Sequence, residues 1–185
     1  MPEELTPDQS RLLVLLSRIT SPARGKGERE RWIKKLPLMA LIHRGITLKV
    51  FGTYDFAPML VEYMGTTRYA SISKEGEDDV ADLREAGLVE RLKLATSHYV
   101  YVSAYRITEK GARRAQEQPD AHRRAVDALT GCKTCGGAME VESREEAPYI
   151  VCRECHTSER VDIFDIEDVP YVSEPLFPDI WLPPE

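Results

Sequence analysis

The stretches Cys132-Lys133-Thr134-Cys135 and Cys152-Arg153-Glu154-Cys155 decide the fold of the C-terminal part of this chain. They contain all four cysteines of the 185 residues, and sixteen residues separate the two pairs. Two C-x-x-C pairs at this separation are typical of four thiolates that bind one zinc ion in a tetrahedron. Gly136 and Gly137 follow the first pair, where the chain must turn tightly and backbone amides can approach the sulfur atoms. We therefore predict one structural zinc ion, held by Cys132, Cys135, Cys152 and Cys155.

Three other chemistries for the cysteines stay open. Residues 152–156 also fit the C-x-x-C-H pattern of covalent haem attachment, which normally accompanies export, whereas residues 1–4 lack the basic and apolar regions of a signal peptide. Four thiolates can also hold a single iron ion or an iron–sulfur cluster. Two redox-active disulfides are the third alternative, although two close pairs in one short segment suit a single metal better. A site closed by four sulfur ligands has no open position for a substrate, so we expect it to stabilise the structure and not to catalyse.

The composition predicts a chain with a packed core. With 185 residues, of which 42% are hydrophobic, one or two small domains are expected. No apolar run is long enough to span a bilayer, so we expect no membrane partner and a cytoplasmic location, where cysteines stay reduced and available to a metal. The net charge of −6 is unevenly distributed: residues 1–60 are net basic, whereas residues 132–185 contain thirteen acidic and four basic residues. A polyanion would therefore meet the N-terminal part.

Apolar periodicity and turn residues predict mostly helices first and mostly strands later. Helices are expected over residues 6–20, 32–44, 55–64, 77–86, 108–118 and 119–129. Strands are expected over residues 88–94, 99–107, 139–141, 149–151 and 160–164, and a short strand or an extended connector over residues 46–51. Tyr99, Tyr101 and Tyr105 are two or four residues apart, so we expect them on one face of their strand.

Residues 82–91 (Asp-Leu-Arg-Glu-Ala-Gly-Leu-Val-Glu-Arg) and 105–111 (Tyr-Arg-Ile-Thr-Glu-Lys-Gly) carry a family resemblance. They resemble the L-x-x-x-G-L-V/I and Y-x-L/I-T-x-x-G passage of MarR-type and PadR-type transcription regulators, over about residues 36–117. The resemblance implies a winged helix-turn-helix, with helix 77–86 in the recognition position and the hairpin over residues 88–107 as the wing.

We therefore predict an α+β fold: a winged helix-turn-helix with extra N-terminal helices, followed by a small C-terminal zinc ribbon. The expected divisions are an N-terminal helix and basic loop (1–30), a winged-helix domain (31–130), the zinc ribbon (131–166) and an acidic, Pro-rich tail (167–185). This order of modules is similar to that of the archaeal transcription factor E family, which implies a role near the transcription machinery.

The helix in the recognition position is acidic, which disfavours readout of a DNA major groove. Its N-terminal part contains Glu75, Glu77, Asp78, Asp79 and Asp82. These carboxylates would face phosphates and acceptor-rich base edges, whereas DNA affinity rests largely on cationic contacts. Acidic residues at a helix N-terminus also have a purely structural role, because they complement the helix dipole.

Other basic residues are better candidates for contacts with nucleic acid. On the predicted wing they are Arg91, Lys93, His98 and Arg106, and in the N-terminal basic stretch they are Arg29, Arg31, Lys34 and Lys35. Such residues suit a phosphate backbone, and an ordinary solvated surface explains them equally well.

The two ends of the chain leave a choice between internal packing and a partner. Residues 167–185 combine five prolines and five acidic residues with several large apolar side chains, so this segment either folds back on its own protein or docks onto a protein partner. The helix over residues 6–20 either packs inside the chain or forms the seam of a homodimer. MarR-type and PadR-type regulators dimerise through terminal helices, so the resemblance implies a dimer.

The sequence thus predicts a transcription-associated protein that binds nucleic acid or the transcription machinery. The alternative is an adaptor or structural subunit that uses the winged helix and the C-terminal segment to dock onto proteins. We expect no enzymatic activity, because the four histidines are scattered and neither a catalytic motif nor a Gly-rich phosphate loop accompanies them.

Overall fold

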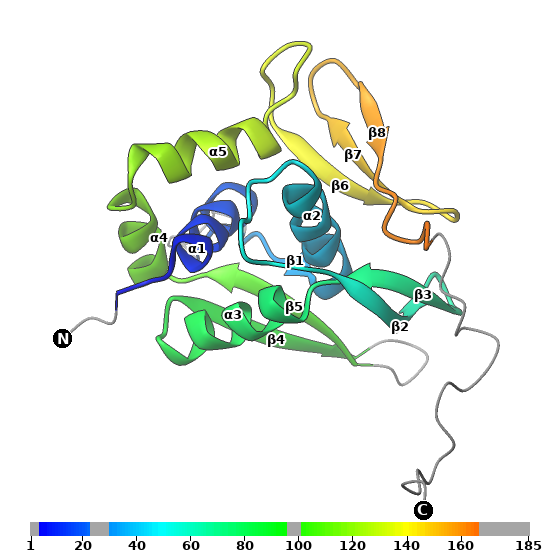
Figure 1. The fold of residues 1–185 in the computed structure, drawn as a ribbon, viewed down its shortest axis with the longest axis horizontal. Helices are drawn as coiled ribbons and strands as arrows, with labels where there is room; N and C mark the ends of the chain where they lie inside the picture. Colours follow the sequence, from blue (N-terminus) through cyan, green and yellow to red (C-terminus); the bar gives the residue numbers. More distant parts are fainter. Residues whose placement is uncertain (1–3, 23–29, 96–100, 167–185) are drawn as a thin grey trace, which may run out of the picture.

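The computed structural model describes residues 4–22, 30–95 and 101–166 (Figure 1). Helices and three small antiparallel sheets alternate along these residues, which confirms the predicted α+β class. The elements are α1 (Pro7–Ile19), β1 (Ile33–Lys34), α2 (Lys35–Thr47), β2 (Ala57–Tyr63), β3 (Thr66–Ile72), α3 (Lys74–Glu85), β4 (Val89–Ala95), β5 (Tyr101–Ile107), α4 (Glu109–Gln116), α5 (Asp120–Thr130), β6 (Met139–Ser143), β7 (Pro148–Cys152) and β8 (Ser158–Arg160).

Helix α1 is the central element of the core. It begins with a capping box, in which Thr6 accepts a hydrogen bond from the Gln9 amide and the Gln9 side chain accepts one from the Thr6 amide, both at 3.1 Å. The five consecutive residues from Leu12 to Leu16 are all buried, and α1 contacts α3, α4 and α5. The apolar side chains of α1 are therefore already packed inside this chain.

A three-stranded sheet with the order β1-β5-β4 lies beside these helices. Strands β4 and β5 pair from Val89 opposite Ile107 to Ala95 opposite Tyr101, as the sequence predicted for a hairpin. The short β1 pairs with β5 at its other edge, where Ile33 is opposite Tyr105. Helix α2 contacts β1 and β5 as well as β6, so it lies between this sheet and the sheet of the C-terminal strands (Figure 1).

The Gly-Leu and Thr-x-x-Gly residues singled out in the sequence meet at one junction. Gly87 ends α3 with a φ of +71°, a conformation that glycine adopts without strain. The Thr108 hydroxyl donates to the Gly87 carbonyl at 2.9 Å and accepts from the Gly111 amide at 2.9 Å. A Cβ atom at position 111 would lie 2.0 Å from the Leu88 carbonyl oxygen, so only glycine fits there. This junction fixes the base of the β4–β5 hairpin against α4.

Three predicted elements differ from the structure, and one of them, a strand over residues 160–164, shares only Arg160 with β8. Residues 55–64 were expected to form a helix but contain β2, which pairs along its whole length with β3. Met64 and Gly65, with φ values of +51° and +79°, form the two-residue turn between the strands, as in a tight hairpin. Residues 46–51 were expected to be a short strand or an extended connector, but α2 continues to Thr47 and a turn follows. A hairpin therefore separates α2 from α3, and no short turn joins them.

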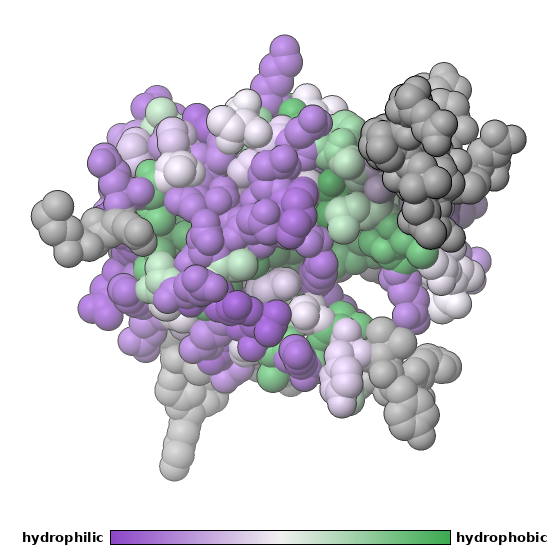
Figure 2. Space-filling view, turned by 60° about the horizontal axis from the view of Figure 1, so that its bottom comes forward, coloured by the Kyte–Doolittle hydropathy of each residue, from purple (hydrophilic) through white to green (hydrophobic). Residues whose placement is uncertain are grey.

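The β2–β3 hairpin has one buried and one exposed face. Tyr63 is buried and Met59 and Val61 are half-buried, whereas Leu60 and Glu62 between them are exposed, which is the period of a strand. The exposed fraction is 61% for Leu60 and 59% for Met64 at the turn. Figure 2 shows hydrophobic surface at the end of the molecule where Figure 1 places this hairpin.

The hydrophobic core is one continuous cluster that extends from Leu12 in α1 to Ile163 after the last strand. None of the helices in the described residues is long and apolar enough to cross a membrane.

A buried carboxylate ties α1 to the turn that follows α2. Asp8 is 2% exposed, and its carboxylate accepts hydrogen bonds from the Thr53 amide at 2.7 Å, the Thr53 hydroxyl at 2.6 Å and the Gly52 amide at 3.0 Å. Arg11 forms an ion pair with it at 2.6 Å. Burial raises the pKa of Asp8, but the hydrogen bonds from Thr53, Gly52 and Arg11 outweigh burial and hold the pKa below its usual value.

We predict that Asp8→Asn lowers the free energy of unfolding by about 2 kcal/mol at neutral pH, because the amide cannot replace a carboxylate that accepts from charged and backbone donors. The pKa of Asp8 is lower in the folded than in the unfolded protein. Ionised Asp8 therefore stabilises the fold at pH values above its pKa in the unfolded protein, and this stabilisation disappears as the pH falls through its pKa in the folded protein. Urea unfolding at neutral and strongly acidic pH should show the difference between wild type and variant shrinking in acid. The control Asp127→Asn, in an exposed pair with Arg18, should cost less than about 0.5 kcal/mol; equal effects of the two variants would contradict the assignment.

Candidate metal centre

The four cysteines lie at one end of the three-stranded sheet β6-β7-β8. The first pair precedes β6, while Cys152 is the last residue of β7 and Cys155 lies in the turn to β8. Met139 in β6 is directly opposite Cys152, so pairing of the two strands brings the two turns together.

Each C-x-x-C pair forms the same kind of turn. The Gly136 amide donates to the Cys132 carbonyl at 2.8 Å, and the His156 amide donates to the Cys152 carbonyl at 3.1 Å. Both donor residues have positive φ values, +76° for Gly136 and +60° for His156. His156 thus occupies the position of a turn residue in the second pair, and its ring is not needed for the cluster of sulfur atoms.

The sulfur atoms are arranged as ligands of one ion. All four Sγ atoms lie within 4.8 Å of one another; the distance from Cys132 to Cys155 is 3.6 Å and that from Cys135 to Cys152 is 3.4 Å. A tetrahedron with Zn–S bonds of about 2.3 Å has edges of about 3.8 Å, whereas a disulfide needs about 2.05 Å. The four residues fit a single metal site, as the sequence predicted.

The surroundings of three of the thiols shift their pKa values in different directions. The Thr157 hydroxyl, 3.1 Å from the sulfur, and the Thr157 amide lower the pKa of Cys155 to about 6. Backbone amides at Cys135 and Thr134 lower the pKa of Cys132. The Gly137 amide lowers the pKa of Cys135, but the sulfur atoms of its neighbours outweigh that amide and raise the pKa to about 12. A divalent cation would favour the thiolate form of every ligand.

The cysteine-bearing sheet is fixed to the β2–β3 hairpin by backbone and aromatic contacts. The Ser71 amide donates to the Ile163 carbonyl at 2.7 Å, and the Tyr63 hydroxyl donates to the Arg144 carbonyl at 2.5 Å. The rings of Tyr63 and Phe164 lie 4.8 Å apart. These contacts join residues of the hairpin to residues on both sides of β7.

Helix α2 provides a second anchor for this sheet. Arg44 is 6% exposed, and its guanidinium forms an ion pair with Glu159 of β8 at 2.7 Å. Truncating the exposed Glu159 would leave the buried guanidinium of Arg44 without its carboxylate, so this pair helps to fix the position of β8 on α2.

The predicted nucleic-acid residues fall into two groups. Arg106 forms ion pairs with Glu30 at 2.6 Å and Glu90 at 2.7 Å, and its guanidinium lies 4.5 Å from the Trp32 ring centre. Arg31 pairs with Glu140 at 3.1 Å, and Lys35 pairs with Glu77 at 2.7 Å. These three cations form ion pairs within the chain, and the sequence alone did not identify their acidic partners.

The second group is exposed. Arg91 and Lys93 lie on β4 and Lys34 on β1, and within the described residues none of them has a carboxylate at ion-pair distance. Arg29 and His98 lie outside the described residues. The structure therefore places Arg91 and Lys93 on one strand and Lys34 on β1, at the opposite edge of the same sheet.

The carboxylates of α3 are also used in internal contacts. Asp79 accepts from the Tyr54 hydroxyl at 2.5 Å and from the Gln9 side chain at 2.9 Å. Asp78 pairs with Lys74 at 2.7 Å on the same helix. Together with the Lys35–Glu77 pair, these contacts give the acidic residues of α3 a structural role.

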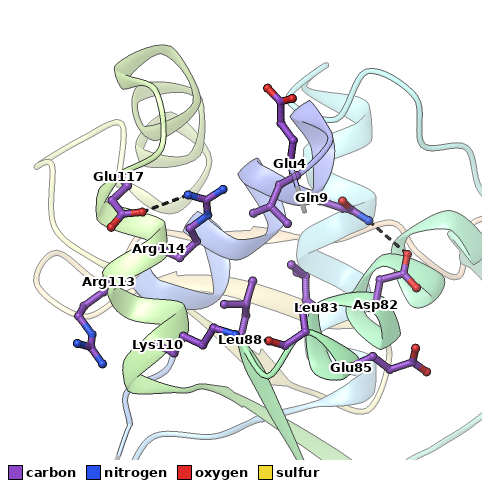
Figure 3. Close-up of a pocket in the computed structure, with 12 residues that line it drawn as sticks. Glu4, Gln9, Asp82, Leu83, Glu85, Leu88, Lys110, Arg113, Arg114 and Glu117 are labelled. Atoms are coloured by element: carbon purple, nitrogen blue, oxygen red, sulfur yellow. Dashed lines mark hydrogen bonds and ion pairs between the residues drawn. The ribbon is translucent and has the colours of Figure 1, made fainter. Parts of the chain in front are cut away.

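A groove of about 1090 Å³ lies between α1, α3 and α4 (Figure 3). Leu83 and Leu88 are apolar residues of its lining, Lys110, Arg113 and Arg114 supply cations from α4, and Asp82 and Glu85 supply carboxylates from α3. Lys110 donates to the Ala86 carbonyl at 2.8 Å, and Arg114 pairs with Glu117. The residues that line the groove are charged or apolar apart from Gln9, and include no Cys, His, Ser or Thr.

We predict that the affinity of the cysteine site for a divalent metal rises with pH across the neutral range. Binding must displace protons from thiols, most of all from Cys135, and acid restores those protons. Competition with a chromophoric chelator at several pH values measures the effect, and an affinity independent of pH would contradict it. The control variant His156→Asn keeps a residue that tolerates positive φ and should bind metal like the wild type; a clear loss would make the imidazole a ligand.

Comparison with known proteins places the chain in one family. No curated protein and no solved structure matches it. The sequence profile of the uncharacterized protein MJ1567 family matches residues 8–161, from the first turn of α1 to the residue after β8. Because this match covers most of the chain, from the capped helix to the second cysteine pair, the protein belongs to the uncharacterized protein MJ1567 family.

Proposed function

We propose that this protein is a zinc-stabilised scaffold of the winged-helix type that binds nucleic acid through its β4–β5 hairpin, in the setting of the transcription machinery. The observation that carries the proposal is the pair Arg91 and Lys93, exposed on β4 without a carboxylate at ion-pair distance among the described residues. Arg31, Lys35 and Arg106 are bound to acidic partners, whereas Arg91 and Lys93 have none among the described residues and lie on one strand, available to phosphates.

The order of elements supports a winged-helix arrangement. Helix α1, strand β1 and helices α2 and α3 precede the β4–β5 hairpin, and β1 pairs with β5 at the edge opposite β4. The β4–β5 hairpin would be the wing. The β2–β3 hairpin, inserted between α2 and α3, distinguishes this chain from a helix-turn-helix with a short turn.

Helix α3 is a poor candidate for entry into a major groove. Its first two turns carry Glu75, Glu77, Asp78 and Asp79, and part of this charge holds the helix to Lys35 and Tyr54. DNA binding by this helix would require separating these contacts and placing carboxylates against phosphates. The hairpin is therefore the better surface for nucleic acid.

Zinc fits the cysteine cluster best among the metals considered. Four thiolates in two C-x-x-C turns suit a soft, tetrahedral ion, and the sheet that they close is too small to fold on a large core of its own. Such a closed site serves stability. A site closed by four sulfur ligands leaves no open position for a substrate, which favours a structural role over catalysis at this site.

We predict that native mass spectrometry of purified protein detects one zinc ion per chain. Cys132→Ser should lose the ion, and hydrogen exchange should then accelerate in β6, β7 and β8, because the two turns are no longer joined. The control Lys133→Ala changes an exposed residue of the same turn and should keep the zinc. Iron in the purified protein, or a metal-free chain with two disulfides, would contradict the assignment.

We predict that the double variant Arg91→Ala, Lys93→Ala binds nucleic acid at least about tenfold more weakly at low salt, since two phosphate contacts are lost. Fluorescence anisotropy with labelled oligonucleotides at two salt concentrations measures this. The control Arg124→Ala removes an exposed cation from α5 and should change affinity little. Failure of the wild type to bind at low salt would remove the nucleic-acid proposal.

A second candidate function, a protein-docking adaptor, is favoured by the β2–β3 hairpin. Leu60, Met64 and Tyr69 form an exposed apolar surface on and beside its outer face, and such surfaces are common at protein interfaces. The C-terminal segment predicted as a docking peptide, residues 167–185, lies outside the described residues. Absence of nucleic-acid binding would favour this candidate.

A further inference from the structure

One face of the β4–β5 hairpin combines cations with aromatic side chains. In the register of the two strands, Arg91 is opposite Tyr105, Lys93 is opposite Ser103 and Ala95 is opposite Tyr101. Residues opposite each other in an antiparallel pair project from the same face, so both cations and both tyrosines share one face. Tyr101 and Tyr105 are four residues apart, a spacing of about 13 Å along the strand. The prediction that these tyrosines share a face is confirmed, and Tyr99 lies outside the described residues.

The charge of this face is purely positive in the described parts of β4 and β5. The carboxylate of Glu90 belongs to the opposite face, where it pairs with Arg106. On the neighbouring helix α3, Glu77 and Asp78 are each paired with a lysine. Nothing on the strands themselves therefore neutralises Arg91 and Lys93.

The aromatic residues are unequally exposed. Tyr101 is 72% exposed, the highest value among the large hydrophobic residues of the described chain, whereas Tyr105 is half-buried against the core. The exposed ring of Tyr101 contributes little to folding, since it buries little surface. Its ring is available to a planar partner, and Tyr105 fixes the same face to the core.

These features fit single-stranded nucleic acid better than a duplex. A duplex keeps its bases stacked inside and presents phosphates, for which cations alone suffice. A single strand exposes base faces that stack on aromatic side chains, while its phosphates follow a basic surface. We propose that the face formed by Arg91, Lys93, Tyr101 and Tyr105 binds single-stranded nucleic acid, with one base stacked on Tyr101 and adjacent phosphates bound by the two cations. This inference rests on the proposed function and names the ligand class of the same hairpin.

The test uses the full chain with its metal and three labelled probes of equal length: oligo(dT), oligo(rU) and a mixed-sequence duplex. Anisotropy at low and physiological salt should show tighter binding of the single strands than of the duplex. Tyr101→Ala should weaken single-strand binding about tenfold, whereas Tyr101→Phe should bind like the wild type, because stacking requires the ring and not the hydroxyl. The double variant of Arg91 and Lys93 should reduce the slope of log K against log salt by about 1.4.

Tyr69→Ala is the matched control, because Tyr69 is an exposed tyrosine on the other hairpin and should not affect binding. Thermal unfolding of each variant verifies that the fold is retained. Binding of the duplex in preference to single strands, or single-strand binding unaffected by Tyr101→Ala, would overturn this inference and leave the proposed function standing. Absence of binding to all three probes would overturn both.

Discussion

The convergence of four sulfur atoms on one point is the constraint on which the C-terminal half of the structure depends. The three strands that carry them contain thirteen residues, too few to fold by burial of apolar surface alone. The ion at Cys132, Cys135, Cys152 and Cys155 would join the two turns, while Ile150, Val161 and Ile163 attach this region to the core of the molecule. With its two turns joined, the sheet contacts the β2–β3 hairpin and places Glu159 beside the buried Arg44 of α2. A local coordination site therefore affects packing in the rest of the molecule.

Internal ion pairs determine which charges remain for binding. The sequence places basic residues before β1 and acidic residues in α3, a pattern that suggests two opposed surfaces. In the fold, Arg106 joins Glu30 to Glu90, and Lys35 neutralises Glu77. A partner would therefore encounter a surface that is locally more neutral than the sequence suggests, apart from the cations of β4.

The sequence predicted those features whose physical signal is local. Thr6, Gln9 and Pro7 mark the start of α1 through capping chemistry, and the C-x-x-C spacing predicted that the four cysteines come together. The hairpin at residues 57–72 was missed because Ala, Met, Leu and Glu in β2 are good helix formers, and Gly65 is as typical of a helix end as of a hairpin turn. Pairing with β3 decides the structure there. The partners of Asp8 and Arg106 are distant in sequence, so no local pattern could reveal them.

The cysteines differ in their access to solvent: the first of each pair is buried and the second is exposed. A chelator or an oxidant arriving from solution would thus reach Cys135 and Cys155 first, one in each turn. Cys132 and Cys152 would keep their positions beside the strands while the outer two ligands are exchanged. Exchange of a bound metal would therefore begin at the two exposed cysteines, while the two buried ones would hold their places in the turns.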